Sequence, residues 1–225
     1  YYVDFDKIKQ ILKGVDIVYH CAATAYEGLS VFSPNFITKN IVQASVSMMS
    51  ASIACGVKRF IYCSSMARYG ENLVPFTEDM IPYPQDPYGI GKYSGELFLR
   101  NLSEVHGMEY VIVVPHNIIG PRQKYDDPYR NVASIMINRM LQSKQPIIYG
   151  DGEQKRCFSF FQDDIDVLLV VAENPEAVGQ VINIGPDEEF VSINTLSVTI
   201  ADLLNFKLDP IYVPGRPQEV KLANC

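Results

Sequence analysis

Length, composition and charge exclude several classes of protein. The chain has 225 residues, of which 48% are hydrophobic and 20% are charged, enough for one domain or for one domain with a small lobe. Its formal net charge is −7, which argues against a surface for nucleic acid. No apolar run reaches the roughly 18 residues that a membrane span needs, and no signal peptide is visible.

The cysteines indicate the redox compartment. They are odd in number and lack metal-like spacing, so we expect reduced, mostly structural thiols in a cytoplasm, and no metal site. The five are Cys21, Cys55, Cys63, Cys157 and Cys225.

The predicted elements alternate between strands and helices, which is typical of a parallel sheet with crossover helices. In chain order, strands are expected near 15–21, 59–64, 110–114, 147–149 and 181–184. Between them, helices are expected at about 34–54, 88–105, 129–142, 164–172 and 193–204. Segments rich in Pro, Asp and Gly, at 71–87 and 120–128, are predicted to be long loops over a cleft.

Tyr88 and Lys92 form the most informative pair of side chains. They are four residues apart on a predicted helix, so both lie on one face. An ammonium beside a phenol favours the phenolate, which lets the tyrosine move a proton nearer neutral pH than its usual pKa of about 10 allows. Ser64 and Ser65 end the preceding apolar strand, and a hydroxyl there can share a hydrogen bond with the substrate oxygen. Alone, a Tyr-x-x-x-Lys pair usually marks only a solvated helix face, so the neighbouring motifs decide.

Six blocks of sequence occur in the order found in one enzyme family. They are Asp16–Ala23 with His-x-Ala-Ala, Gly56–Ser65, Tyr69-Gly70, Pro87-Tyr88-Gly89 with Lys92, Asn117–Gln123, and Tyr149–Gln154 with Arg156. Together they resemble the extended short-chain dehydrogenases/reductases, in particular the nucleotide-sugar epimerases and dehydratases.

The resemblance implies an α/β fold: a Rossmann-like parallel sheet with helices on both faces and a small mixed C-terminal lobe. Residues 1–120 would be the remainder of an NAD-binding domain. Residues 121–225 would mainly bind a nucleotide sugar, with about 155–190 returning to the main domain. The family's glycine-rich turn and first strands are absent from the sequence, so we expect some 50 or more preceding residues, from one or two βαβ repeats of about 30 residues. NAD as cofactor is an implication of the family, and the segment that selects NAD over NADP is not in the sequence.

The resemblance also assigns roles in catalysis and cofactor binding. Tyr88 would take the proton from a sugar hydroxyl, and Lys92 would lower the pKa of Tyr88 and hold the nicotinamide ribose. Ser65 would hydrogen-bond the same sugar oxygen, with Ser64 as the alternative catalytic serine and a cofactor-side residue. Three further cofactor contacts are expected from the small Ala22 and Ala23 and from Asn40, which is otherwise a local hydrogen-bonder.

The substrate side is predicted from residues that suit a nucleoside diphosphate. Arg156 and Arg216 resemble two diphosphate-binding arginines, because a guanidinium is planar and always charged. Asn117 resembles an asparagine at the diphosphate, and Glu219 lies in the same motif as Arg216. The family pattern usually has Asp where Cys157 stands, so the resemblance does not define the sugar side of the pocket. Asp163 and Asp164 are expected to begin a helix and not to bind a metal.

The residues after Ser65 separate reaction types within the family. Dehydratases of the 4,6 type have an Asp-Glu pair there, because elimination of water needs an additional acid and base. Here Met66-Ala67 follows. We therefore expect a UDP-sugar 4-epimerase acting on UDP-glucose/galactose or their N-acetyl forms, by transient oxidation and re-reduction at C4.

Five alternatives remain open. The chain could be a nucleotide-sugar reductase, dehydratase or decarboxylase of the same family, or a steroid-type dehydrogenase that shares the Tyr-Lys pair. A different class is a non-catalytic dinucleotide-binding scaffold, against which the intact serine, tyrosine and lysine argue. A homodimer is also expected, through pairing of the helices at 34–54 and 88–105 with those of a second subunit.

Overall fold

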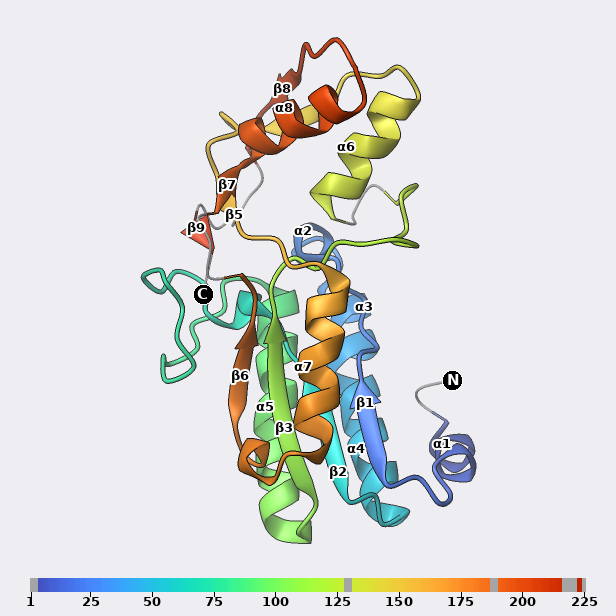
Figure 1. Ribbon diagram of the computed structural model, residues 1–225. Helices are drawn as coiled ribbons and strands as arrows, with labels where there is room; N and C mark the ends of the chain where they lie inside the picture. The colour runs from blue at the N-terminus through green and yellow to red at the C-terminus, as the bar shows by residue number, and fades with distance from the viewer. Residues whose placement is uncertain (1–3, 128–130, 187–189, 216–221, 224–225) are drawn as a thin grey trace.

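The computed structural model describes residues 4–127, 131–186, 190–215 and 222–223. Its main body is a parallel four-stranded sheet in the order β1-β2-β3-β6 (Figure 1). These strands are β1 (Ile17–His20), β2 (Arg59–Cys63), β3 (Glu109–Pro115) and β6 (Val181–Ile184). The predicted parallel sheet is confirmed, and each strand begins or ends within two residues of its expected range.

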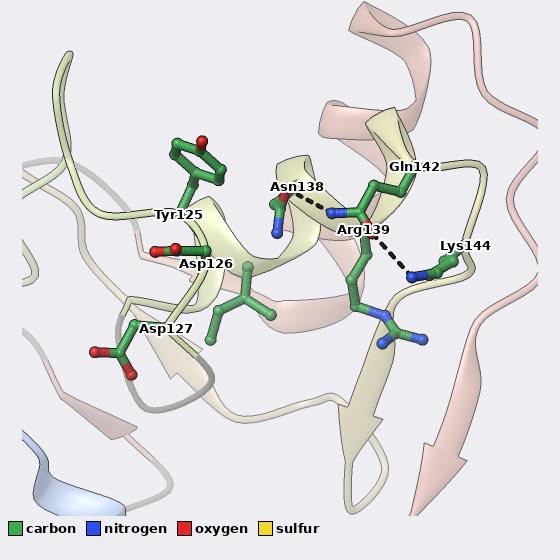
Figure 2. A pocket seen from close by; sticks show the side chains of 8 residues that line it. Tyr125, Asp126, Asp127, Asn138, Arg139, Gln142 and Lys144 are labelled. Carbon is green, nitrogen blue, oxygen red and sulfur yellow. Dashed lines mark hydrogen bonds between the residues drawn. The ribbon is translucent and has the colours of Figure 1, made fainter.

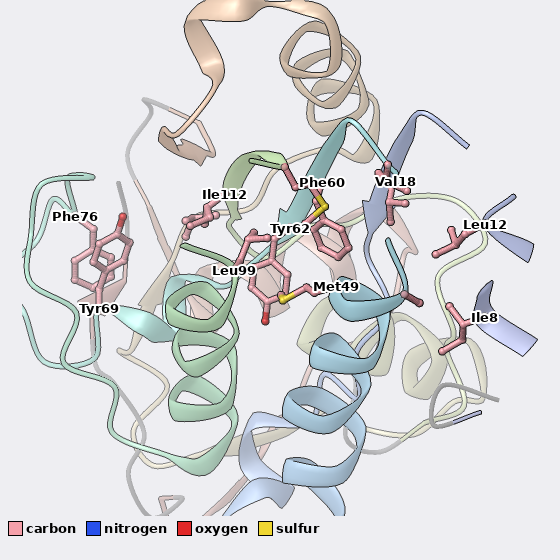
Figure 3. Packing of buried hydrophobic residues seen from close by; sticks show 14 residues of the cluster. Ile8, Leu12, Val18, Met49, Phe60, Tyr62, Tyr69, Phe76, Leu99 and Ile112 are labelled. Atoms are coloured by element: carbon pink, nitrogen blue, oxygen red, sulfur yellow. The ribbon is translucent and has the colours of Figure 1, made fainter. Parts of the chain in front are cut away.

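Helices cover both faces of this sheet, which explains why β2 and β3 are apolar along most of their length. Behind the sheet in Figure 1 lie α4 (Ala44–Ala54) and α5 (Pro87–His106), and in front lies α7 (Phe161–Glu173). Phe60 and Tyr62 of β2 face the first layer, where they join one buried cluster with Met49 of α4 and Leu99 of α5 (Figure 3). Ile61 faces the other layer and α7.

The helix predicted at 34–54 is a chain of three helical segments. It comprises α3 (Pro34–Thr38), a π-helical turn η1 (Lys39–Gln43) and α4. Such a turn widens a helix locally, and periodicity of apolar residues does not reveal it. Two short helices precede it, α1 (Phe5–Ile11) and α2 (Glu27–Ser30), and Asp4 caps α1 through the N–H of Lys7.

A smaller lobe lies beyond the carboxyl end of the main sheet (Figure 1). In it α6 (Val132–Leu141) and α8 (Ile193–Leu203) pack around Ile148 of β4 (Ile147–Tyr149). The lobe's β4 pairs in parallel with β8 (Ile211–Val213). A second small sheet joins β5 (Lys155–Arg156) to β7 (Val191–Ser192) and β9 (Leu222–Ala223). Of these strands only β4 was predicted, and β5, β7 and β9, with two residues each, are too short for a sequence pattern to predict.

After the lobe's β5 the chain continues into α7 and β6 of the main body. After β5, an isolated bridge between Ile119 and Phe160 leads into α7, and the 3₁₀ turn η3 (Pro175–Ala177) leads into β6. A second 3₁₀ turn, η2 (Met66–Arg68), follows β2. Both η2 and the start of α5 therefore lie at the edge of the main sheet that faces the lobe. No helix in the described ranges is both long and apolar enough to cross a membrane.

Candidate active site

The N-terminus of α5 fixes the position of Tyr88. Asp86 caps this helix, because its carboxylate accepts hydrogen bonds from the N–H groups of Tyr88 (2.8 Å) and Gly89 (3.1 Å). Tyr88 is largely buried and packs against two isoleucines of α3 and the π turn. The Asp-Pro-Tyr sequence carries the signal for this cap, an acidic residue followed by proline at the first helical position, but we did not predict its role.

Lys92 lies one helical turn after Tyr88 and extends toward the end of β2. Its Nζ donates a hydrogen bond of 2.7 Å to the carbonyl oxygen of Cys63, and lies 5.2 Å from the ring centroid of Tyr62. The side chain is buried, and this burial lowers the pKa of Lys92 to about 8. The lysine is therefore held with its ammonium at the carboxyl end of the sheet.

The two serines after β2 differ in their surroundings. Ser64 is buried, and its hydroxyl donates a 2.5 Å hydrogen bond to Glu96. Ser65 is only half-buried, and its hydroxyl oxygen accepts a hydrogen bond from the N–H of Ala67 (3.2 Å). Because the Ser65 oxygen accepts this bond, the O–H of the same hydroxyl can still donate a hydrogen bond to a substrate. The geometry therefore favours Ser65 over Ser64 as the group that contacts a substrate.

A close approach of backbones brings Ser65 to the start of α5. A side chain at Gly89 would place its Cβ 2.6 Å from the carbonyl oxygen of Ala67, a distance that real Cβ atoms do not show. Only glycine fits there. Since Ala67 follows Ser65 by two residues and Gly89 follows Tyr88 directly, this contact brings together the two segments that carry the serine and the tyrosine.

A buried ion pair beneath these residues was not predicted. Arg68 Nε lies 3.0 Å from Glu96 Oε1, and both side chains are almost fully buried. Glu96 is on the same helix face as Lys92, four residues on, and also accepts the hydrogen bond from Ser64. The pair thus ties η2 to α5. The sequence shows only that Glu96 lies four residues after Lys92. Arg68 is 28 positions before Glu96, so no local pattern pairs the two.

The residues predicted for the cofactor lie at the end of β1. Ala22 is exposed and Ala23 half-buried, directly after this strand. His20, just before them, is buried, shares a 2.9 Å hydrogen bond with Ser45, and has its pKa lowered to about 4 by burial. Asn40 lies in the π turn, where its amide donates to the carbonyl oxygen of Phe36 at 2.7 Å.

The small hollow next to Ser65 brings together two of the predicted substrate residues. About 30 Å³ in volume, it is lined by Asn117, Arg156, Met66, Ala67, Gly70, Phe76 and Glu27. The amide of Asn117 donates to the carbonyl oxygen of Cys157 (2.9 Å). Arg216 and Glu219 lie outside the described residues.

A larger pocket of about 180 Å³ lies elsewhere, between α6 and the loop before it (Figure 2). Tyr125, Asp126 and Asp127 line one side, and Asn138, Arg139, Gln142 and Lys144 of α6 and its C-terminal end line the other (Figure 2). None of the proposed catalytic residues reaches it. The smaller hollow, by contrast, is lined by Met66 and Ala67, which directly follow Ser65, and by two of the predicted substrate residues, Asn117 and Arg156.

This arrangement fits a dinucleotide at the carboxyl end of the sheet, where ligands bind in open α/β folds. The small side chains of Ala22, which is exposed, and Ala23, which is half-buried, leave room for a flat ring against the backbone. The Lys92 ammonium can donate a hydrogen bond to the oxygen of a ribose hydroxyl. In the described residues, no group of three or more acidic, cysteine or histidine side chains is arranged to hold a metal ion.

Comparison with known proteins gives relatives named for several activities, among them epimerases, a decarboxylase and a dehydratase. UDP-glucose 4-epimerase from Mycolicibacterium smegmatis is 30% identical over 205 residues, 89% of this chain and 64% of the relative. UDP-N-acetyl-alpha-D-glucosaminuronate decarboxylase from Bacillus cytotoxicus is 29% identical, over 94% of this chain and 66% of the relative. The chain spans 60% to 67% of the length of four curated relatives, these two among them.

The fold agrees with these relatives. The crystal structure of UDP-glucose 4-epimerase from Thermotoga maritima with UDP-glucose superimposes with a TM-score of 0.93 at 31% identity, over 99% of this chain and 72% of that one. Residues 2–185 match the sequence profile of the NAD dependent epimerase/dehydratase family. Because this match covers most of the chain and includes the Tyr-Lys helix, the chain belongs to that family.

Proposed function

We propose that the protein containing this chain is an NAD-dependent UDP-sugar 4-epimerase. The observation that carries the proposal is the end of β2, where the Lys92 ammonium bonds to the carbonyl oxygen of Cys63 and Ser65 is followed by Met66 and Ala67 in place of an acid-base pair. These residues supply proton transfer at one sugar carbon but no additional acid and base for elimination of water after the serine. The relatives named as UDP-glucose 4-epimerases support this reading.

In this mechanism Tyr88 takes the proton from the C4 hydroxyl of the sugar, while the hydroxyl of Ser65 donates a hydrogen bond to the same oxygen. Lys92 holds a positive charge near Tyr88 and so favours its phenolate form. NAD, when bound, supplies the acceptor and later the donor of a hydride. After the keto sugar has turned its other face, Tyr88 returns the proton to the C4 oxygen.

We further propose which parts of the chain contact which parts of the ligands. Ala22, Ala23, Ser64 and Asn40 would lie on the cofactor side, in the unit formed by residues 1–120 and the returning segment at about 155–190. Asn117, Arg156, Arg216 and Glu219 would hold the nucleoside diphosphate from the lobe side. Arg156 lining the same hollow as Asn117 supports the second assignment.

A decarboxylase acting on a UDP-uronic acid is the second candidate, since one relative has that name. Its substrate carries a carboxylate on the sugar. Glu27 and Arg156 both line the hollow, and Glu27 is exposed, so the charges there do not select between a neutral and an acidic sugar.

The test incubates the purified full-length protein with UDP-galactose and, separately, with UDP-N-acetylgalactosamine, while NMR resolves the sugars and absorbance follows NADH. The expected result is conversion to the gluco epimer without net change in NADH. Steady formation or consumption of NADH with another nucleotide sugar would instead assign the protein to the reductases or decarboxylases. No reaction and no NADH signal would favour a binding scaffold.

A further inference from the structure

Two cysteines face each other at the carboxyl end of the main sheet. The Sγ atoms of Cys21 and Cys63 lie 3.4 Å apart. Cys63 is the last residue of β2, and Cys21 directly follows the last residue of β1. The parallel register pairs His20 with Tyr62, so one further step along both strands sets the two cysteines opposite each other.

The backbone at this point suits a disulfide. Neighbouring strands lie about 4.8 Å apart, within the range of about 4.4–6.8 Å over which Cα atoms can be bridged. In-register residues of parallel strands point to the same face of a sheet, so both side chains lie on the side of α7. The sulfur atoms need to approach by only about 1.4 Å to reach bonding distance.

The two thiols are chemically different, and charged groups on both faces of the sheet contribute. Cys21 is exposed, and its hydrogen bond with Cys63, with help from the Lys92 ammonium, lowers its pKa to about 7. Cys63 is half-buried, and the hydrogen bond with Cys21 and burial raise its pKa, as does the charge of Asp164 on α7. An accessible thiolate beside a protonated thiol is the arrangement of a reactive cysteine with a resolving partner.

We propose that Cys21 and Cys63 are an oxidation site, at which a peroxide converts the two thiols to a disulfide. The Cys21 thiolate attacks one oxygen of hydrogen peroxide, the O–O bond breaks, and a sulfenic acid and hydroxide form. The Cys63 sulfur then attacks the Cys21 sulfur, the S–OH bond breaks, and water leaves with the Cys63 proton. The two thiols lose two electrons and two protons, and the peroxide is reduced to two molecules of water.

The disulfide connects two segments of the proposed active site, so its effect on turnover rests on the proposed function. Cys21 precedes Ala22, and Cys63 precedes Ser64 and Ser65. Lys92 donates its hydrogen bond to the carbonyl oxygen of Cys63, and the thiol pair is a source of negative charge for this ammonium. Oxidation removes that charge and shifts the strand end, so the oxidised protein turns over more slowly.

The chemical test is a peptide map of the purified full-length protein after treatment with hydrogen peroxide, digested without reductant. We expect a cross-linked peptide pair containing Cys21 and Cys63, lighter by about 2 Da than the two thiols and separated by dithiothreitol. Cys55 and Cys157 should remain thiols in the same digest, because they are half-buried and buried. Absence of this cross-link, with Cys21 instead oxidised to a sulfinic acid or left unchanged, would overturn the proposal.

The functional test compares oxidised and reduced rates within each variant. In the wild type, peroxide should lower turnover and dithiothreitol should restore it. Cys63→Ser should not show this reversible loss, whereas Cys55→Ser should show it as the wild type does. An equal reversible loss in Cys63→Ser would refute the link to turnover. A protein without epimerase activity but with the cross-linked peptide would contradict the proposed function and leave the oxidation site established.

Discussion

Lys92 combines two properties that oppose each other, a charge required near Tyr88 and an environment that disfavours charge. Its ammonium is buried and bonds to the carbonyl oxygen of Cys63 at 2.7 Å. Desolvation favours the neutral amine, so the pKa of Lys92 falls to about 8 from the usual value near 10.4. The charge is present below this pKa and is lost as the pH rises through it.

We therefore expect turnover to decline as the pH rises through about 8, because the neutral amine no longer favours the Tyr88 phenolate. The measurement is a profile of kcat against pH for the wild type and for Lys92→Arg. The guanidinium stays charged over this range, so the residual rate of Lys92→Arg should lack the decline. A wild-type rate that holds constant up to about pH 10 would show that Lys92 is not the group responsible.

Tyr88→Phe removes the proposed proton acceptor and keeps the ring that packs against Ile37 and Ile41. We expect kcat to fall by about 10²- to 10⁴-fold, the usual contribution of a positioned acid or base, with little change in the affinity for the UDP-sugar. Tyr83→Phe is a matched control, because Tyr83 is 64% exposed in the loop before α5. Turnover of Tyr88→Phe equal to that of Tyr83→Phe would remove Tyr88 from the mechanism.

Local sequence could indicate these residues because their geometry is local. The spacing of Tyr88 and Lys92 within one helix already places both on one face. The structural difference between Ser64 and Ser65 could not be predicted in the same way. It depends on Glu96, whose carboxylate accepts the Ser64 hydroxyl, and a glutamate on a helix is ordinarily expected at the surface.

At the scale of elements, the Arg68–Glu96 pair connects η2, which follows the proposed catalytic serine, to the helix that carries Tyr88 and Lys92. Glu96 also has an Oε2 atom that is buried without a hydrogen-bond partner within the described part of the chain. A buried pair of charges contributes little net stability, but removal of one partner leaves the other charge uncompensated. The pair therefore acts mainly to fix how the two elements meet.

Arg68→Met should lower the free energy of unfolding by about 3–5 kcal/mol, because Glu96 would then be a buried carboxylate without its cation. The double variant Arg68→Met with Glu96→Met should recover most of this loss. Urea unfolding of the single and double variants measures both. Lys58→Met is the control: its pair with Asp16 is as short, 2.9 Å, but exposed to solvent, so this variant should unfold at nearly the wild-type urea concentration. Equal losses in Arg68→Met and Lys58→Met would refute this role.

The elements also show where prediction from sequence ends. Strands β2, β3 and β6 of the main sheet were predicted because apolar runs are typical where helices cover both faces of a sheet. The strands β5 and β7 have two residues each and pair with segments more than 30 positions away, so no local pattern records them. Arg156 lies in β5, and its place beside Asn117 thus depends on pairing that only the folded chain shows.

At the scale of the whole molecule, α5 presents apolar side chains outward as well as toward the sheet. Ile90 and Leu97 are 51% and 50% exposed, and Phe98 is 45% exposed. Ile90 and Leu97 are seven residues apart, two helical turns, so they lie along one outer stripe of the helix. A helix that is apolar on its outer side commonly packs against another protein surface. This stripe supports the expected homodimer.

We predict that the full-length wild-type protein is a dimer and that Leu97→Asp is a monomer, since burial of an unpaired carboxylate at the centre of the stripe opposes association. Light scattering after size-exclusion chromatography measures both masses. Leu203→Asp is the matched control: Leu203 is 78% exposed at the end of α8 in the lobe, away from the stripe, so this variant should remain a dimer. A monomeric wild type would contradict the homodimer. A dimeric Leu97→Asp would place the interface on another face, and α5 would then contact solvent along its outer side.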